Sequence, residues 1–218
     1  MGTNSNMGFP SAAGDALPRE SAALLRDLHR FTGRRLAAAR DSGEELRKAL
    51  DRDDTTAAEI ALHGFLRDCW EALDGLSREV NLALHHLYPE AALYPPFEMT
   101  RQCTLYMVRK KLHEHPSTAN HPVSGLLWQR TRETPDEAYE RLSFLYNLSL
   151  FFPLELTEGR LPGTEDLPPA ARSIIKSADI ARRDAREGVR EMLNWVEDLL
   201  EKCYALLAEA LRGGDPTR

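Results

Sequence analysis

Histidine is the side chain best suited to moving protons near neutral pH, and this sequence gathers its histidines in one stretch. Ten of the sixteen aromatic residues lie in nearly the same stretch, between Tyr88 and Phe152. We therefore expect any functional site to lie here, although aromatic residues also fill cores and histidines near helix ends commonly act as caps. Five of the seven histidines belong to this stretch: His85, His86, His113, His115 and His121.

Two arginine–histidine pairs have a spacing that could serve phosphate chemistry. Six residues separate Arg78 from His85, and five separate Arg109 from His115. Arg78 and His85 are seven positions apart, which places them on one face of a helix. There the histidine could act as a general acid or base on a ribose hydroxyl, while the arginine stabilises phosphate charge.

This spacing resembles the Arg-x(4–6)-His pattern of the HEPN superfamily, all-helical prokaryotic ribonucleases and toxins that usually act as dimers. The resemblance implies that Arg78 and His85 are catalytic residues and that RNA is the substrate. Glu79 and Lys110 follow the two arginines where a small polar residue is common in that superfamily. Because the chain is rich in arginine, two such pairs are also what chance predicts, so the spacing alone does not identify the activity.

The sequence predicts no metal and no cofactor. His113 and His115 are two positions apart, so they point about 200° apart on a helix, and neither HExxH nor CxxC occurs. The chain also lacks G-x-S-x-G, a Walker loop and G-x-G-x-x-G. Three scattered cysteines within helical patterns are typical of reduced core thiols in a cytoplasmic protein; they are Cys69, Cys103 and Cys203.

Two long helices with heptad spacing are the clearest elements. The first runs over about 56–88, and Thr56 with Glu59 predicts a capping box at its start. The second runs over about 169–212. Each has apolar residues at alternating intervals of four and three, the repeat of knobs-into-holes packing. The seam residues are Leu62, Leu66, Cys69, Leu73, Leu76, Val80, Ala83 and Leu87 in the first helix, and Val189, Met192, Val196, Leu199, Cys203, Leu206 and Ala210 in the second.

The other segments predict an all-α, multi-helix bundle. Further helices are expected over about 18–50, 97–114, 123–132 and 134–152. The proline- and glycine-containing stretch 153–168 is either a lid or a crossover loop. We predict a flexible segment over 1–17, one helical domain over 18–212, and a flexible tail over 213–218.

Charge and hydropathy limit the partners. A net charge of −6 argues against a protein dominated by nucleic-acid phosphates. A basic row at Arg26, Arg30 and Arg34 is interspersed with acidic residues, as on a solvated helix face. The most apolar run, 142–156, is shorter than the ~20 residues that a membrane span needs.

Three functions remain. The leading prediction is a non-enzymatic helical interaction or regulatory protein, homodimeric and cytoplasmic, because the chain has two unbroken seams and no catalytic motif. The alternative is a HEPN-like ribonuclease or nucleotide-binding toxin-type protein that uses Arg78 and His85. The third is a small-ligand pocket lined by Tyr94, Tyr106 and Tyr146. The expected partners are a second copy of the chain, another protein or RNA, and no membrane.

Overall fold

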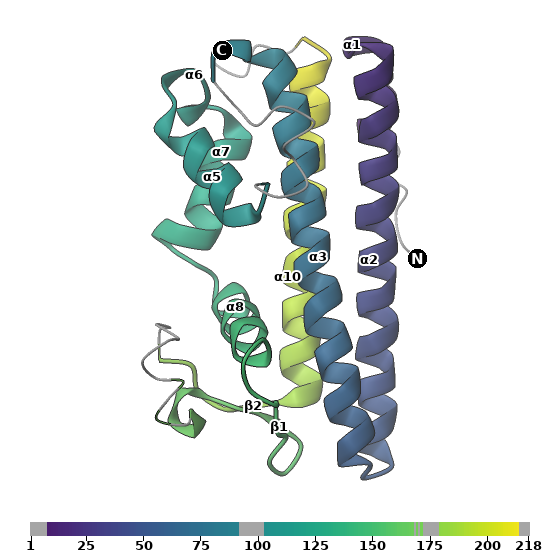
Figure 1. The fold of residues 1–218 in the computed structure, drawn as a ribbon, viewed down its shortest axis with the longest axis vertical. Coiled ribbons are helices and arrows are strands. Elements are labelled where there is room, and N and C mark those ends of the chain that lie inside the picture. The colour runs from purple at the N-terminus through teal and green to yellow at the C-terminus, as the bar shows by residue number, and fades with distance from the viewer. Residues whose placement is uncertain (1–7, 92–102, 168, 170, 172–178, 214–218) are drawn as a thin grey trace. The chain divides into compact units, whose positions relative to one another are not determined.

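The computed structural model is almost entirely helical, which confirms the all-α prediction (Figure 1). It describes residues 8–91, 103–167, 169, 171 and 179–213. In chain order the elements are α1 (Gly8–Ala16), α2 (Arg19–Asp51), α3 (Thr55–Leu87), η2 (Pro89–Ala91), α5 (Leu105–Glu114), α6 (Pro116–Ala119), α7 (Pro122–Trp128), η4 (Gln129–Glu133), α8 (Glu137–Ser149), β1 (Arg160–Leu161), η5 (Thr164–Asp166), β2 (Arg183–Asp184) and α10 (Ala185–Leu211).

The chain divides into two compact units, and the three longest helices contribute to both. Unit 1 comprises Met1–Arg34, Glu71–Thr134 and Glu197–Arg218. Unit 2 comprises Arg35–Trp70 and Pro135–Val196. The single domain expected over 18–212 stays a prediction.

The two heptad seams are buried within the chain. In α3 the residues Leu62 to Ala83 of the seam are fully buried, and Leu87 at the end of the helix is half-buried. In α10, Met192, Val196, Leu199 and Cys203 are likewise fully buried. Burial of apolar area at this density supplies most of the free energy that holds such helices together. A second copy of the chain is therefore not needed to cover either seam.

The start of α3 differs from the predicted capping box. Asp54 Oδ1 accepts a hydrogen bond from the Ala57 backbone N–H at 3.0 Å, so Asp54 is the side chain that caps the helix. Glu59 Oε1 instead accepts the backbone N–H of Leu156 at 3.0 Å. The box with Thr56 is wrong because Glu59 anchors the loop after α8 rather than its own helix start.

The helix predicted over 169–212 is not continuous: residues 179–182 are not helical, and α10 begins at Ala185, while 170 and 172–178 lie outside the described residues. Immediately before α10, Arg183 and Asp184 form β2, which pairs antiparallel with β1. Asp184 Oδ1 then accepts the backbone N–H groups of Arg186 and Glu187 at 2.9 and 3.1 Å, which caps α10. This two-strand ladder lies partly in the stretch 153–168; whether that stretch moves as a lid stays a prediction.

Unit 1 contains a cluster of short helices, and two of the histidines from the histidine-rich stretch are the N-caps of α6 and α7. His115 Nδ1 accepts the Ser117 N–H at 3.3 Å to start α6, and His121 Nδ1 accepts the Val123 N–H at 3.2 Å to start α7. After α7 the chain forms a π-helical turn, η4. These helices place His113 flat against Trp128, with ring centroids 3.7 Å apart.

Helix α1 lies inside the segment that the sequence predicted to be flexible. Its Phe9 is 1% exposed and stacks on Tyr204 of α10, with ring centroids 5.2 Å apart. In the part of the chain that the structure describes, all three cysteines are buried and none forms a disulfide. None of the described helices combines the length and the apolar character that crossing a membrane requires.

Candidate functional site

Arg78 and His85 lie on α3 in unit 1, separated by two helical turns. Both are half-buried, so each is partly shielded from water yet open to a ligand. At 1.5 Å per residue their Cα atoms are about 10 Å apart along the helix axis. The seven-residue spacing places both residues on the same face of α3.

The surroundings of Arg78 are both aromatic and acidic. Its guanidinium carbon lies 5.8 Å from the centre of the Phe31 ring on α2. One turn earlier on α3, the Asp74 carboxylate accepts the backbone N–H of Leu105 at 3.3 Å and so holds the first turn of α5. Burial raises the pKa of Asp74, although the Leu105 N–H and Arg78 act in the opposite direction.

The surroundings of His85 contain a second imidazole. The rings of His85 and His86 are 5.9 Å apart and inclined by 70°. His86 Nε2 is hydrogen-bonded to Ser21 Oγ of α2 at 2.7 Å, which fixes this ring. Burial, followed by the neighbouring His85, lowers the pKa of His86, so its imidazole is neutral at pH 7.

Arg78 and His85 each have a buried nitrogen without a hydrogen-bond partner, a property that they share with other described side chains such as His121, Arg141 and Arg183. Within the described ranges, Arg78 Nε and His85 Nδ1 are both buried and unpaired. A buried polar atom that lacks a partner costs about 1–3 kcal/mol, so such atoms are rare and call for an explanation. A ligand that accepts hydrogen bonds would supply the missing partners.

The second arginine–histidine pair, Arg109 and His115, forms hydrogen bonds that hold helices in place. Arg109 is 6% exposed and donates from one guanidinium nitrogen to both the carbonyl and the hydroxyl of Thr131, each at 2.6 Å. Its partner in the spacing pattern, His115, caps α6 as described above. The structure therefore separates two pairs that the sequence could not: Arg109 and His115 hold helices in place, whereas Arg78 and His85 retain unpaired atoms.

A buried polar cluster that the sequence did not reveal lies next to this site. Glu79 is fully buried on α3 and accepts hydrogen bonds from His29 Nδ1 at 2.9 Å, Thr32 Oγ1 at 2.5 Å and Tyr204 OH at 2.9 Å. Burial, and then the Glu79 carboxylate, raise the pKa of Tyr204, so its hydroxyl stays protonated and able to donate. The three donors come from α2 and α10, positions that no local motif links to Glu79.

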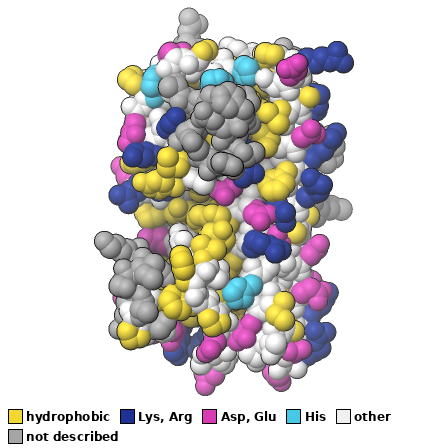
Figure 2. Space-filling model, in the orientation of Figure 1, with side chains coloured by type: hydrophobic (Ala, Val, Ile, Leu, Met, Phe, Trp, Pro, Cys, Tyr) yellow, Lys and Arg dark blue, Asp and Glu magenta, His cyan; other side chains and the backbone are white. Residues whose placement is uncertain are grey.

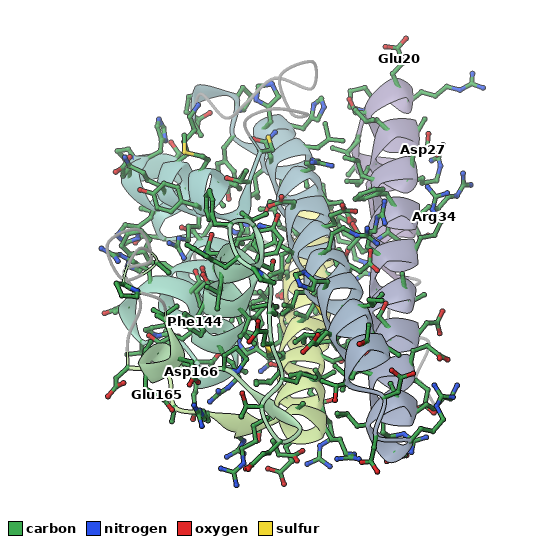
Figure 3. All side chains as sticks on the ribbon, turned by 60° about the horizontal axis from the view of Figure 1, so that its bottom comes forward. Glu20, Asp27, Arg34, Phe144, Glu165 and Asp166 are labelled. Carbon is green, nitrogen blue, oxygen red and sulfur yellow. The ribbon has the colours of Figure 1, made fainter. Side chains whose placement is uncertain are left out.

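The predicted basic row behaves as a solvated surface. Arg30 pairs with Asp27 at 3.1 Å, and both side chains are about 70% exposed. Asp27 and Arg34 point outward from α2 in Figure 3. Exposed pairs of this kind contribute little to stability, and the acids among them offset the attraction for phosphate.

The three tyrosines of the small-ligand hypothesis are not described together. Tyr94 lies outside the described residues. Tyr106 belongs to unit 1 and is 56% exposed, with the Arg109 guanidinium 5.4 Å from its ring centre. Tyr146 belongs to unit 2, where it stacks on Trp70 at 4.6 Å. Among the described residues, no three histidine, cysteine or acidic side chains gather where they could hold a metal ion.

Comparison with known proteins returned no match: no family model, no curated protein and no solved structure resembles the chain.

Proposed function

We propose that the chain is a HEPN-like ribonuclease whose site is the α3 face that carries Arg78 and His85. The observation that supports this proposal is the pair of buried, unpaired nitrogen atoms, one on each residue. A phosphodiester has oxygen acceptors that fit both atoms, and arginine is well suited to phosphate. The other pair that fits the spacing pattern, Arg109 and His115, forms structural hydrogen bonds.

The burial of the heptad seams within the chain weakens the prediction of a non-enzymatic interaction protein. A non-enzymatic interaction protein was the leading prediction because the chain has two unbroken seams and no catalytic motif. Residues such as Leu73 and Leu199 are fully buried within one chain, so they are unavailable to another protein.

The proposed reaction needs no metal. The His85 imidazole takes the proton of a ribose 2′-hydroxyl, and the 2′-oxygen attacks the adjacent phosphorus. The bond from phosphorus to the 5′-oxygen breaks, and the departing oxygen takes a proton from water. The products are a 2′,3′-cyclic phosphate and a 5′-hydroxyl end. Arg78 stabilises the negative charge that grows on the phosphate oxygens in the transition state.

The test is an RNA cleavage assay on purified protein, with and without EDTA. Wild-type protein should produce cyclic phosphate ends whether or not EDTA is present. Arg78→Ala and His85→Ala should each lower the rate at least ~100-fold, the scale of one general acid–base or charge-stabilising group. Circular dichroism should show an unchanged fold, because both side chains are only half-buried.

His115→Asn is the matched control, since asparagine can also cap a helix and His115 lies outside the proposed site. It should cleave RNA at the wild-type rate. Cleavage that survives in both Arg78→Ala and His85→Ala would remove the proposal, and so would the absence of cleavage in wild-type protein.

The proposal includes the cytoplasm as the place of action and a homodimer as the working form. Three buried cysteines, none of them in a disulfide among the described residues, support a reducing compartment. The dimer rests on the resemblance to the HEPN superfamily rather than on the seams. Sedimentation equilibrium should give twice the 24.6 kDa chain mass.

A second candidate is a non-enzymatic interaction protein that binds through unit 2. Three large apolar side chains there are well exposed: Ile60 at 69%, Leu150 at 56% and Phe151 at 62%. Figure 2 shows hydrophobic side chains reaching the surface on the face drawn there. Exposed apolar patches mark interaction sites when they are contiguous. If this candidate holds, Phe151→Ser should abolish self-association measured by sedimentation, and His85→Ala should leave it intact.

A further inference from the structure

A groove in unit 2 lies between α2 and the first turns of α10. It encloses about 650 Å³, within the range of ligand pockets. Its walls are arginine-rich, and its apolar part is formed by Gly43, Val189 and Leu193. A Cβ atom at position 43 would lie 3.2 Å from Val189 Cγ1, so the two helices approach closely where the glycine lacks a side chain. The charged lining residues are Arg40, Glu44, Arg47, Asp184, Arg186, Glu187 and Arg190.

The two helix segments run antiparallel along this groove. Asp51 at the end of α2 pairs with Arg186 at 3.0 Å, and Gly43 faces Val189. Moving back along α2 from Asp51 therefore corresponds to moving forward along α10. The contact of Gly43 with Val189 divides the groove into two ends, which differ in charge.

At the end near Asp51 the charges are already neutralised. Glu44 accepts two hydrogen bonds from Arg47, at 2.7 and 3.0 Å, and this pairing lowers the pKa of Glu44. Asp51 is shared by Arg47 and Arg186 at 2.9 and 3.0 Å. Asp184 is engaged by the first N–H groups of α10. These carboxylates have their partners, and so do the arginines beside them.

At the other end the groove places the guanidinium of Arg190 beside apolar residues. Its lining residues there are Arg40, Arg190 and Leu193, and all three lining carboxylates lie on the far side of the Gly43–Val189 contact. Arg190 is exposed and forms no ion pair with any described residue. A guanidinium beside an apolar floor can hold an anionic head group while the rest of the molecule covers Val189 and Leu193.

We propose that this groove binds a small anionic amphiphile, with its carboxylate or phosphate at Arg190 and its hydrocarbon chain along Gly43, Val189 and Leu193. The site is independent of the ribonuclease proposal, since all its residues belong to unit 2. The apolar chain gains by leaving water, and the anion gains charge-assisted hydrogen bonds.

The experiment is isothermal titration of the full chain with dodecanoate, and with dodecyltrimethylammonium as a probe of equal chain length and opposite charge. Dodecanoate should bind and the cation should not. Arg190→Ala should weaken dodecanoate binding about tenfold, equivalent to ~1.4 kcal/mol, and Arg190→Glu should abolish it. Arg190→Lys should restore most of the affinity. Circular dichroism should show that all three variants fold, because Arg190 is exposed.

Arg34→Ala is the matched control, because Arg34 is an exposed arginine on α2 that points away from the neighbouring helices (Figure 3). It should bind dodecanoate as wild-type protein does. The proposal is overturned if dodecanoate does not bind, if both probes bind equally, or if Arg190→Ala and Arg34→Ala behave alike.

Discussion

Glu79 and Arg78 are neighbours in the sequence, yet they differ in whether their buried polar atoms have hydrogen-bond partners. Glu79 is fully buried, and three donors from two other helices satisfy its carboxylate. Arg78 is half-buried, and its Nε has no partner among the described residues. A satisfied buried network stabilises a fold, whereas an unsatisfied buried polar atom costs stability. The number of hydrogen-bond partners therefore distinguishes Glu79, a structural residue, from Arg78, which we propose to be a functional one.

The largest expected effect follows from removing the satisfied carboxylate. Glu79→Ala would leave the donors of His29, Thr32 and Tyr204 without an acceptor in the core. We expect the free energy of unfolding to fall by about 3–5 kcal/mol in urea denaturation. Glu79→Gln keeps an acceptor oxygen and the side-chain size, so its loss should stay near ~1 kcal/mol. Equal losses in the two variants would contradict the role assigned to this cluster.

His121 has one ring nitrogen with a hydrogen-bond partner and one without. Its Nδ1 accepts the Val123 N–H, and its Nε2 is buried without a partner in the described structure. Burial lowers the pKa of His121 from 6.5 to about 4. Between pH 6.5 and about pH 4, His121 is protonated in the unfolded chain but stays neutral in the folded chain. The free energy of unfolding therefore falls as the pH is lowered through this range.

For His121 alone, the loss between about pH 7 and about pH 4.5 should be roughly 2.5 kcal/mol. His121→Asn keeps a capping oxygen and does not titrate. Urea unfolding at both pH values should therefore show a smaller loss for the variant than for wild-type protein. Identical pH dependence in the two proteins would show that His121 is not the titrating group.

A smaller effect is expected where a histidine serves only as a cap. His115→Ala removes the acceptor for the Ser117 N–H at the start of α6, and we expect a loss of about 1 kcal/mol. The thermal midpoint measured by calorimetry should drop accordingly, and His115→Asn should recover it. A loss of stability as large as that of Glu79→Ala would mean that His115 stabilises more of unit 1 than the start of α6.

The smallest expected effect on stability is at the proposed site itself. Arg78→Met keeps the apolar stem, loses the contact with Phe31 and removes a buried nitrogen that has no partner. These changes oppose each other, so the free energy of unfolding should stay within ~0.5 kcal/mol of wild type. Urea denaturation measures this directly. A loss above ~2 kcal/mol would place Arg78 with Glu79 among the structural residues.

The sequence predicted the long helices because their signal is repetitive. Each seam residue from Leu62 to Ala83 adds to the same 3.5-residue pattern, so one irregular position does not obscure it. Boundaries depend on single side chains and were predicted less well. Glu59 could cap its own helix or reach the Leu156 N–H, and only the folded chain shows that it does the latter. Likewise, the strand pairing of Arg183 and Asp184 ends the helical pattern before Ala185.

The site was predictable only in part. The spacing of Arg78 and His85 was visible in the sequence, but so was that of Arg109 and His115. Which pair is free depends on Thr131, twenty-two positions after Arg109, and a spacing rule cannot see that contact. The Glu79 cluster was missed for the same reason, because Tyr204 lies 125 positions away.

The placement of the tryptophans has an optical consequence. Trp128 lies in unit 1 against His113, whereas Trp195 lies in unit 2 and donates to Asp136 at 2.5 Å. With Trp70 replaced by phenylalanine, removing either remaining indole leaves a protein whose emission reports one unit only. Coincident fluorescence transitions in the two proteins would show that the units melt as one cooperative body, and separated transitions would give each unit its own unfolding curve.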